Sequence, residues 1–169
     1  LAPVTKEDYI AMLDWSLTQN AYPVAIKIPG GSMISTGVPV TKDFSKLDTY
    51  EITKKGSRVA ILGLGTFYEN AVKAADILKS SHGIDATVIN PYYISGIDAD
   101  TLNELKKDHA VVATLEDGYL EGGFGAKIAA FYGSSDMKVL NFGIKKEFID
   151  RYDVAEVIKD NHLTPEQIA

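Results

Sequence analysis

The sequence has no cysteine, only two arginines and no long apolar run. Without cysteine there are no disulfide bonds, no thiolate metal ligands and no cysteine nucleophile, and this composition fits a cytoplasmic protein. Arginine occurs only at Arg58 and Arg151, so a binding site formed by several bidentate guanidinium groups is not expected. No stretch approaches the roughly 20 apolar residues of a membrane span, so no membrane segment is predicted.

Positive charge is also scarce. The formal net charge of -6 over 169 residues argues against nucleic-acid and anionic-membrane partners, which require a basic surface. The histidines at His82, His109 and His162 have no paired ligands nearby in the sequence, so no metal site is predicted. The length allows one good core, or one domain with an appendage.

Residues 1–29 carry the signals of one helix and one strand. Thr5 with Asp8 three residues later is a capping box, and "DYIAMLDWSL" then has apolar residues at helical spacing. The run "YPVAIKIPGG" is typical of a short strand that ends at its proline and glycines. Since this pair cannot bury its apolar sides alone, we interpret it as the end of an earlier domain. Residues 30–47 are rich in glycine, serine and proline and are predicted to be a linker.

Strand and helix patterns alternate over residues 48–169. Thr66 with Glu69 predicts a capped helix start, Gly83 its end, and Asp98 the N-cap of the next helix. The expected strands are "YEITKKG", "RVAILGLG", "IDATVIN", "AVVATLE" and "MKVLNFG", several of them apolar throughout, as strands covered on both faces are. The fold class is therefore α/β: a three-layer sandwich with a mostly parallel sheet, preceded by the helix–strand remnant.

Two glycine-rich turns raise the question of nucleotide binding. "GLGTFYENA" lacks the third glycine of a dinucleotide fingerprint, and the acid expected after the next strand is replaced by Asn90. "EDGYLEGGFGAKIA" lacks the Gly-Lys-Ser/Thr ending of a P-loop, and the acids Glu116 and Asp117 would repel a phosphate. Gly122, Gly123 and Gly125 instead favour a close backbone approach, and we expect these five residues at or beside a protein interface.

The segments "GSRVAILGLGTFYENAVKAADILK", "ATVINPYYISGIDADTLNEL" and "VATLEDGYLEGGFGAKIA" together resemble the C-terminal domain of the transketolase superfamily. The resemblance covers the chain: 1–29 is similar to the end of the pyrimidine-binding domain, and 48–169 to the complete C-terminal domain. Within the superfamily, the ending "LNFGIKKEFIDRYDVAEVIKDNHLTPEQI" is most similar to the 1-deoxy-D-xylulose-5-phosphate synthases.

This resemblance implies an enzyme that transfers aldehyde or ketone residues with thiamine diphosphate and Mg²⁺, condensing pyruvate with glyceraldehyde 3-phosphate for isoprenoid precursor synthesis. The resemblance places the cofactor and metal in N-terminal domains outside this sequence. We therefore expect no catalytic residue and no bound cofactor in this chain, which would be inactive alone. Its implied contributions are a wall of the substrate channel and the surface of a homodimer.

The sequence departs from the family at the positions that hold the substrate phosphate. Lys27 and Gly30 replace an arginine pair in "AIKIPGG", and Tyr92 replaces an arginine after the second strand of the C-terminal domain. The resemblance makes Lys27 and Tyr92 the candidate substrate-binding residues. A lysine is a point charge without the guanidinium fork, and a tyrosine offers one neutral hydrogen bond, so weaker phosphate binding is expected.

Other functions stay open at this point. One alternative is a transketolase half or a fragment of a 2-oxoacid dehydrogenase beta subunit, both of which share this C-terminal domain. Another is a non-catalytic regulatory or interaction domain. Residues 1–29 favour the enzyme fragment, because an independent module has no use for part of a neighbouring domain.

Overall fold

The computed structural model describes all 169 residues, and five strands form one sheet in the order β1-β3-β2-β4-β5. Strand β1 runs antiparallel to β3, and all other neighbouring pairs are parallel. The helices are α1 (Lys6–Thr18), α2 (Tyr68–His82), α3 (Ala99–Leu105), α4 (Phe124–Tyr132), α5 (Val154–Asp160) and α6 (Pro165–Ile168). The strands are β1 (Glu51–Lys54), β2 (Arg58–Gly63), β3 (Thr87–Asn90), β4 (His109–Tyr119) and β5 (Lys138–Ile144). The α/β fold with a mostly parallel sheet is confirmed.

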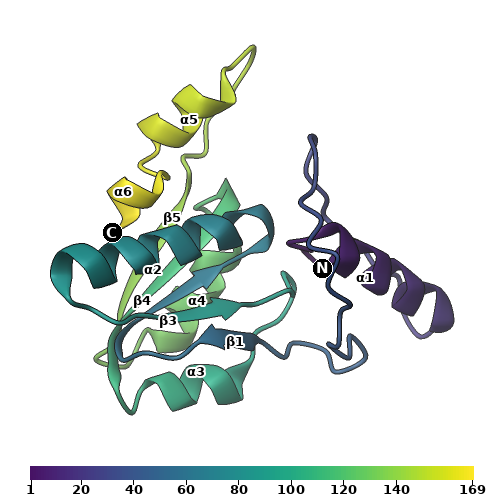
Figure 1. Cartoon of the computed structure of the whole chain (residues 1–169), viewed down its shortest axis with the longest axis horizontal. Coiled ribbons are helices and arrows are strands. Elements are labelled where there is room, and N and C mark those ends of the chain that lie inside the picture. The colour runs from purple at the N-terminus through teal and green to yellow at the C-terminus, as the bar shows by residue number, and fades with distance from the viewer.

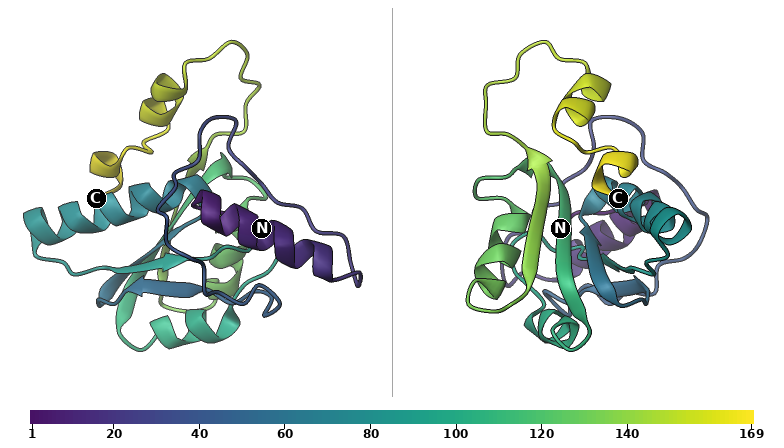
Figure 2. Two further views of the ribbon diagram at one scale, coloured as in Figure 1. Left: turned by 45° about the vertical axis from the view of Figure 1, so that its right-hand side comes forward. Right: turned by 90° about the vertical axis from the view of Figure 1, so that its left-hand side faces the viewer.

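Each face of the sheet carries its own core, because successive side chains of a strand point to opposite faces. Leu62, Ile89 and Val112 pack with α3 and α4, whereas Ile61 and Val88 pack with α2 and the C-terminal residues. Figure 2 shows the resulting layers, with α4 on one side of the strands and α2 on the other. This two-sided burial explains why the parallel strands are apolar throughout.

The N-terminal segment packs against the sheet domain through a third cluster. Met12 of α1, Phe44 of the segment before β1, and Tyr92 and Tyr93 after β3 are all buried in it. Figure 1 shows α1 set apart from the sheet, beside the start of β1 and the loop that follows β3. The N-terminal segment is thereby attached where β1 begins and β3 ends, and its Ala2 also joins the core on the face covered by α3 and α4.

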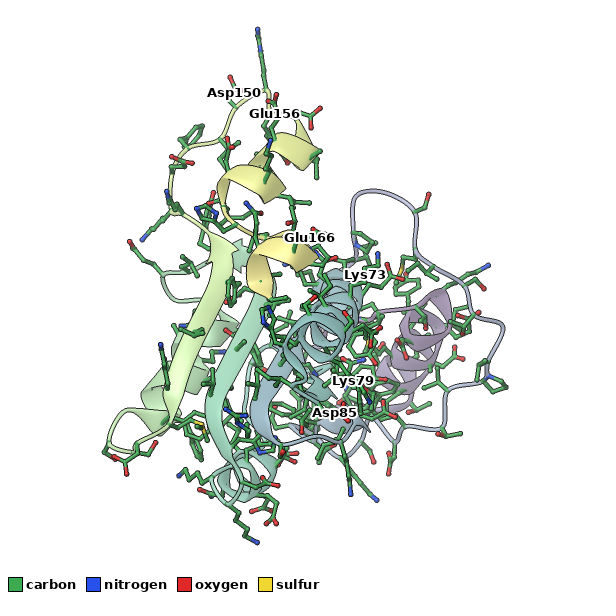
Figure 3. The ribbon with its side chains drawn as sticks, turned by 60° about the vertical axis from the view of Figure 1, so that its left-hand side comes forward. Lys73, Lys79, Asp85, Asp150, Glu156 and Glu166 are labelled. Atoms are coloured by element: carbon green, nitrogen blue, oxygen red, sulfur yellow. The ribbon has the colours of Figure 1, made fainter.

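The C-terminal region after β5 extends away from the body before it returns. Figure 3 shows Asp150 and Glu156 at the outer part of this arm, and Glu166 on α6, where the chain comes back beside α2. Leu163 is fully buried against the α2 side of the core and anchors the return. No helix is both long enough and apolar enough to cross a membrane.

Two local predictions are wrong. Residues 22–29 form no strand, because the only backbone partner they find is Leu1, which bonds Ala25 and Lys27 at 2.8 Å each. A single residue cannot supply the ladder that a strand needs. Thr66 does not cap α2: residues Gly65–Phe67 form a 3-10 turn (η1), and the helix starts without any side-chain cap.

Three other helix signals are confirmed. Thr5 and Asp8 form the predicted capping box of α1, and Asp98 accepts a hydrogen bond from the backbone N–H of Thr101 at the start of α3. Gly83 ends α2 in the left-handed conformation, with φ of 67°. Local hydrogen-bonding signals of this kind act over three or four residues, so they can be recognised without the tertiary structure.

Candidate functional site

The glycine-rich turn after β4 is built around the buried carboxylate of Glu116. Strand β4 continues past the expected end to Tyr119, and Glu116 within it is only 5% exposed. Its two oxygens accept hydrogen bonds from the backbone N–H groups of Phe124, at 2.9 Å, and Gly125, at 2.8 Å. These groups are the unpaired donors at the start of α4. The protein's own carboxylate therefore occupies the position that a phosphate would need.

The glycines make room for this carboxylate. A Cβ at Gly123 would lie closer than 3.0 Å to Glu116, and one at Gly125 closer than 3.0 Å to Thr114 Oγ1 and to Asn141. Gly122 meets no neighbour but has φ of 74°, a conformation that favours glycine. All three glycines thus have a role inside the chain, and their expected place beside an interface stays a prediction.

Lys27 lies against the same turn. Its ammonium group pairs with the carboxylate of Asp117 and lies 3.3 Å from the Asp117 carbonyl oxygen. The Lys27 side chain is 43% exposed and that of Asp117 is 34% exposed, so solvent screens this ion pair. The lysine charge is therefore partly compensated within the chain. Gly30 is exposed and has no neighbour within 4 Å of a built Cβ.

Tyr92 is buried at the other side of this edge. Its hydroxyl donates a hydrogen bond of 2.7 Å to Glu51 Oε2, and its backbone N–H donates to Asn90 Oδ1 at 3.2 Å. Burial, and then the bond to the Glu51 carboxylate, raise the pKa of Tyr92 above its usual value. The hydroxyl therefore stays protonated and acts as a donor. The Lys42 ammonium lies 5.2 Å from the centre of the Tyr92 ring, within cation–π range.

The two predicted substrate-binding residues, Tyr92 and Lys27, line two different cavities. Tyr92 lines a polar cavity of about 280 Å³ between the start of α1, residues 36–42 and the β1–β3 pair. Lys27 lines a different, mainly apolar cavity of about 540 Å³ that also contains Trp15, Tyr22 and Tyr93. The structure therefore does not bring Lys27 and Tyr92 into one cavity; it brings Lys27 to Asp117 instead.

Three further polar residues line the Tyr92 cavity but were not predicted from the sequence to be functional. In the sequence, Asp8 is interpreted as a helix cap and Lys42 as part of a linker. Asn90 is interpreted as the residue that replaces a ribose-binding acid. Each of them lines the cavity. Of these three residues, only Asn90 has a sequence feature that indicates a binding site, because it lies at the carboxyl end of a predicted parallel strand.

The chain provides no cluster of three or more histidine, cysteine or acidic side chains that could hold a metal ion. His109 is nearly buried: its Nε2 lies 2.8 Å from Thr87 Oγ1 and its Nδ1 lies 2.6 Å from Asp108. It therefore connects the strand starts at the amino edge of the sheet, away from the two cavities.

Comparison with known proteins identifies relatives of this chain by sequence and by fold. Residues 48–168 match the sequence model of the transketolase C-terminal domain. The chain is 35% identical to the 1-deoxy-D-xylulose-5-phosphate synthase of Clostridium acetobutylicum over 162 residues, which is 94% of this chain and 26% of that enzyme. It is 32% identical to the Clostridium tetani enzyme of the same name, over 99% of this chain and 27% of that one.

A solved structure shows the same architecture over nearly the whole chain. The superposition on a "Split gene transketolase, inactive beta4 tetramer" has a TM-score of 0.79 and covers 99% of this chain and 53% of the other, at 21% identity. This likeness concerns the fold. The chain spans about a quarter of the length of the curated relatives that it matches.

Proposed function

Because the chain belongs to the transketolase C-terminal domain family, we propose that it is the C-terminal part of a thiamine-diphosphate-dependent enzyme that transfers aldehyde or ketone residues, namely a 1-deoxy-D-xylulose-5-phosphate synthase. The observation that carries this proposal is the 35% identity over 94% of the chain to an enzyme of that name. The reaction would join pyruvate to a short aldehyde, glyceraldehyde 3-phosphate, for isoprenoid precursor synthesis. We propose a cytoplasmic location, which the absence of cysteine supports.

The residues of this chain do not fit the diphosphate and metal of the cofactor. There is no cluster of acidic or histidine side chains for Mg²⁺. The start of α4, the best placed group of backbone donors beside the glycine turn, already holds Glu116. We therefore derive no step through the cofactor and assign its binding to the parts of the enzyme that the relatives have in addition to this region.

The proposed contribution of this chain is a wall of the substrate channel. Tyr92 and Lys27 lie on two sides of the N-terminal segment where it meets the sheet domain, each in its own cavity. Tyr92 offers one hydroxyl donor, already directed at Glu51, and Lys27 offers a charge that Asp117 shares. Substrate binding at these two positions would therefore be weaker for a phosphate than at two arginines.

The second proposed contribution is a homodimer surface around the turn at Glu116, Asp117, Gly122, Gly123 and Gly125. Tyr119 and Glu121 within this turn are exposed and accessible to a partner. The turn is also held rigidly from inside by the Glu116 carboxylate. A rigid turn with an exposed aromatic side chain suits an interface, because little conformational entropy is lost on binding.

A chimera tests the proposal. This chain would replace the matching C-terminal quarter of the Clostridium acetobutylicum enzyme, and condensation of pyruvate with glyceraldehyde 3-phosphate would be measured. We expect activity that depends on added thiamine diphosphate, and a raised KM for the phosphorylated aldehyde after Lys27→Ala. Glu104→Ala, at an exposed ion pair on α3, is the control with no expected effect. A folded chimera that binds the cofactor but performs no condensation contradicts the proposal.

A transketolase half, or a 2-oxoacid dehydrogenase beta-subunit fragment, is the second candidate. The fold likeness to a split-gene transketolase over 99% of this chain favours the first of these. The native full-length enzyme distinguishes them, because ketol transfer to a sugar phosphate without loss of carbon dioxide from pyruvate would identify a transketolase. Retention of the pyruvate reaction alone would favour the synthase.

A further inference from the structure

The polar cavity beside Tyr92 contains buried polar groups with unused hydrogen-bonding capacity. Asp8 is 5% exposed: its Oδ2 accepts from the backbone N–H groups of Val4 and Thr5, while Oδ1 has no partner. Asn90 is 3% exposed: its Oδ1 accepts from Tyr92, while the amide nitrogen Nδ2 has no partner. Both residues line the cavity. Neither Asp8 Oδ1 nor Asn90 Nδ2 is fully enclosed, since the only enclosed side-chain atoms without a hydrogen-bond partner are the Tyr50 hydroxyl and His109 Nδ1. An acceptor and a donor are therefore accessible to a molecule inside the cavity.

The charges around the cavity disfavour an anion. Asp8 and Glu51 contribute two carboxylates, and Lys42 contributes one ammonium group. This ammonium is already engaged: it donates to the carbonyl oxygen of Thr49 at 2.8 Å and to its hydroxyl at 3.1 Å. A phosphate would meet a net negative surface at short range, where Coulomb repulsion is strong. In this respect the cavity is the opposite of a phosphate site lined by arginines, which presents positive charge to its ligand.

Uncharged hydroxyl groups of a ligand can form hydrogen bonds with the polar groups that line this cavity. A hydroxyl donates to a carboxylate and accepts from an amide at once, so one ligand can serve both Asp8 Oδ1 and Asn90 Nδ2. The Tyr68 hydroxyl, which donates to Thr53 at 2.8 Å, keeps acceptor capacity at the same cavity. The volume of about 280 Å³ equals that of about nine water molecules, at ~30 Å³ each. This is the size of a small sugar.

We propose that this cavity binds the hydroxylated chain of an uncharged polyol of three to five carbon atoms, and that Asp8, Glu51 and Asn90 select it over the phosphorylated form. Polyol binding is a property of this chain alone. The proposal goes beyond the proposed function and does not rest on it, because the aldehyde of that reaction carries the phosphate that this cavity disfavours.

The direct test is a titration of the ¹⁵N-labelled chain, followed by NMR, with erythritol and separately with sn-glycerol 3-phosphate. We expect saturable shifts at the amides of Asp8, Asn90 and Tyr92 with erythritol, with a Kd of about 1–10 mM for so small a ligand. The phosphate ester should bind at least about tenfold more weakly. Equal binding of both probes, or no saturable shift at these amides up to about 100 mM, overturns the proposal.

A charge-neutral variant tests the source of the selectivity. Glu51→Gln keeps the shape of the side chain and removes one of the two negative charges, so the preference for erythritol should fall about tenfold. Glu104→Gln is the matched control, because Glu104 is an exposed glutamate on α3 that pairs with Lys107 outside the cavity. An unchanged preference in Glu51→Gln contradicts the charge argument.

The aromatic ring of Tyr92 allows a second comparison. Tyr92→Phe removes the hydroxyl that orients Glu51, whereas Tyr93→Phe removes a hydroxyl that donates to the Phe44 carbonyl outside this cavity. We expect several-fold weaker erythritol binding only in Tyr92→Phe, and equal effects would contradict the assignment. Failure of the titrations would leave the chimera assay untouched, while an inactive chimera would leave the titrations standing.

Discussion

At the scale of single residues, Glu116 explains the most unusual stretch of the sequence. The strand-to-helix turn with four glycines looks suited to a phosphate, and the two acids before it look unfavourable for one. The structure reconciles these features, because the Glu116 carboxylate is itself the anion bound at the start of α4. Gly123 and Gly125 are small because this carboxylate and Thr114 occupy the space beside them.

Replacement of Glu116 by alanine should destabilise the fold. Both backbone N–H groups at the start of α4 would lose their acceptor in a buried position, at a cost of about 1–3 kcal/mol. Urea unfolding of Glu116→Ala measures this cost. Glu121→Ala removes an exposed glutamate that pairs with Lys146 at 3.1 Å, and should change stability by less than about 0.5 kcal/mol. Equal losses in the two variants would contradict the buried role of Glu116.

Gly125→Ala tests the close packing of the same turn. Alanine favours a helix over glycine by roughly 0.5–1 kcal/mol, so propensity alone predicts stabilisation. The new Cβ would however lie closer than 3.0 Å to Thr114 and Asn141, and such overpacking costs about 1–3 kcal/mol. We expect net destabilisation in thermal unfolding. Gly30→Ala, where a Cβ meets nothing within 4 Å, is the neutral control, and a more stable Gly125→Ala would contradict the packing argument.

At the scale of elements, the attachment of α1 depends on polar contacts as well as on the Met12 cluster. Glu7 on the first turn of α1 accepts hydrogen bonds from the Ser35 hydroxyl at 2.6 Å and from the backbone N–H groups of Thr36, at 3.2 Å, and Gly37, at 3.0 Å. The Glu7 side chain thus adds to the backbone hydrogen bond of 2.8 Å from Lys6 N–H to Ile34 O in holding this irregular segment against the start of α1. Such a contact has no sequence signature, since it joins residues about 30 positions apart.

The Glu7 contact should depend on pH over an unusually low range. The hydrogen bond from Ser35, followed by the backbone bonds, lowers the pKa of Glu7 from 4.5 to about 2. Because the folded pKa is the lower one, the stabilisation is complete above about pH 4.5 and is lost as the pH falls toward 2. NMR of the Thr36 and Gly37 amides at pH 3–4 should still show the contact.

Glu7→Gln should weaken this contact at every pH, and Glu156→Gln, on the distant α5, should leave it unchanged. The Glu7 carboxyl resonance provides the second readout. A titration midpoint at the ordinary value of 4.5 would show that the hydrogen bonds do not stabilise the charged form.

At the scale of the whole molecule, the two parts of the chain make unequal contributions. The sheet domain has two complete cores, whereas α1 leaves Ile10, Leu13 and Leu17 exposed at helical spacing. An amphipathic helix normally buries such a stripe. The relatives are about four times as long as the matched region, and we propose that their additional domains cover this face in the complete enzyme.

The isolated chain should not bind thiamine diphosphate tightly in the presence of Mg²⁺. The physical reason is that it offers no metal-binding cluster, and that its helix α4 already holds a carboxylate at its start. Isothermal titration calorimetry measures the affinity, with the active chimera as the positive control. Binding in the micromolar range would contradict this prediction and place part of the cofactor site here.

The chain should form a homodimer through the turn that follows β4. Tyr119, the last residue of β4, is 46% exposed beside this turn, and burial of an aromatic side chain contributes strongly to an interface. Light scattering should show a dimer that Tyr119→Glu dissociates. Tyr152→Glu, at a 59% exposed tyrosine on the C-terminal arm, is the matched control. A monomer at the highest attainable concentration would contradict the assignment of this surface to the dimer.

The α/β class, the order of elements from β1 to α6 and the family were all predictable from the amino-acid sequence. These features depend on local patterns: apolar strands, the capping residues Thr5 and Asp98, and the left-handed Gly83. Such patterns involve neighbours within a few positions, so they are readable along the chain. The predicted strand at 22–29 failed for a related reason, because β-branched residues favour a strand only where another strand is present to pair with.

The contacts of the candidate residues, by contrast, became visible only in the folded chain. The fold separated Lys27 from Tyr92, paired Lys27 with Asp117, and placed Lys42, Asp8 and Asn90 around Tyr92. It also buried Glu116 at the start of α4 rather than leaving it at a solvated strand end. These outcomes depend on contacts between residues up to 90 positions apart, as for Lys27 and Asp117. The position of an arginine-replacing residue is visible in a sequence, but its partners are set by the packing of the N-terminal segment against the edge of the sheet.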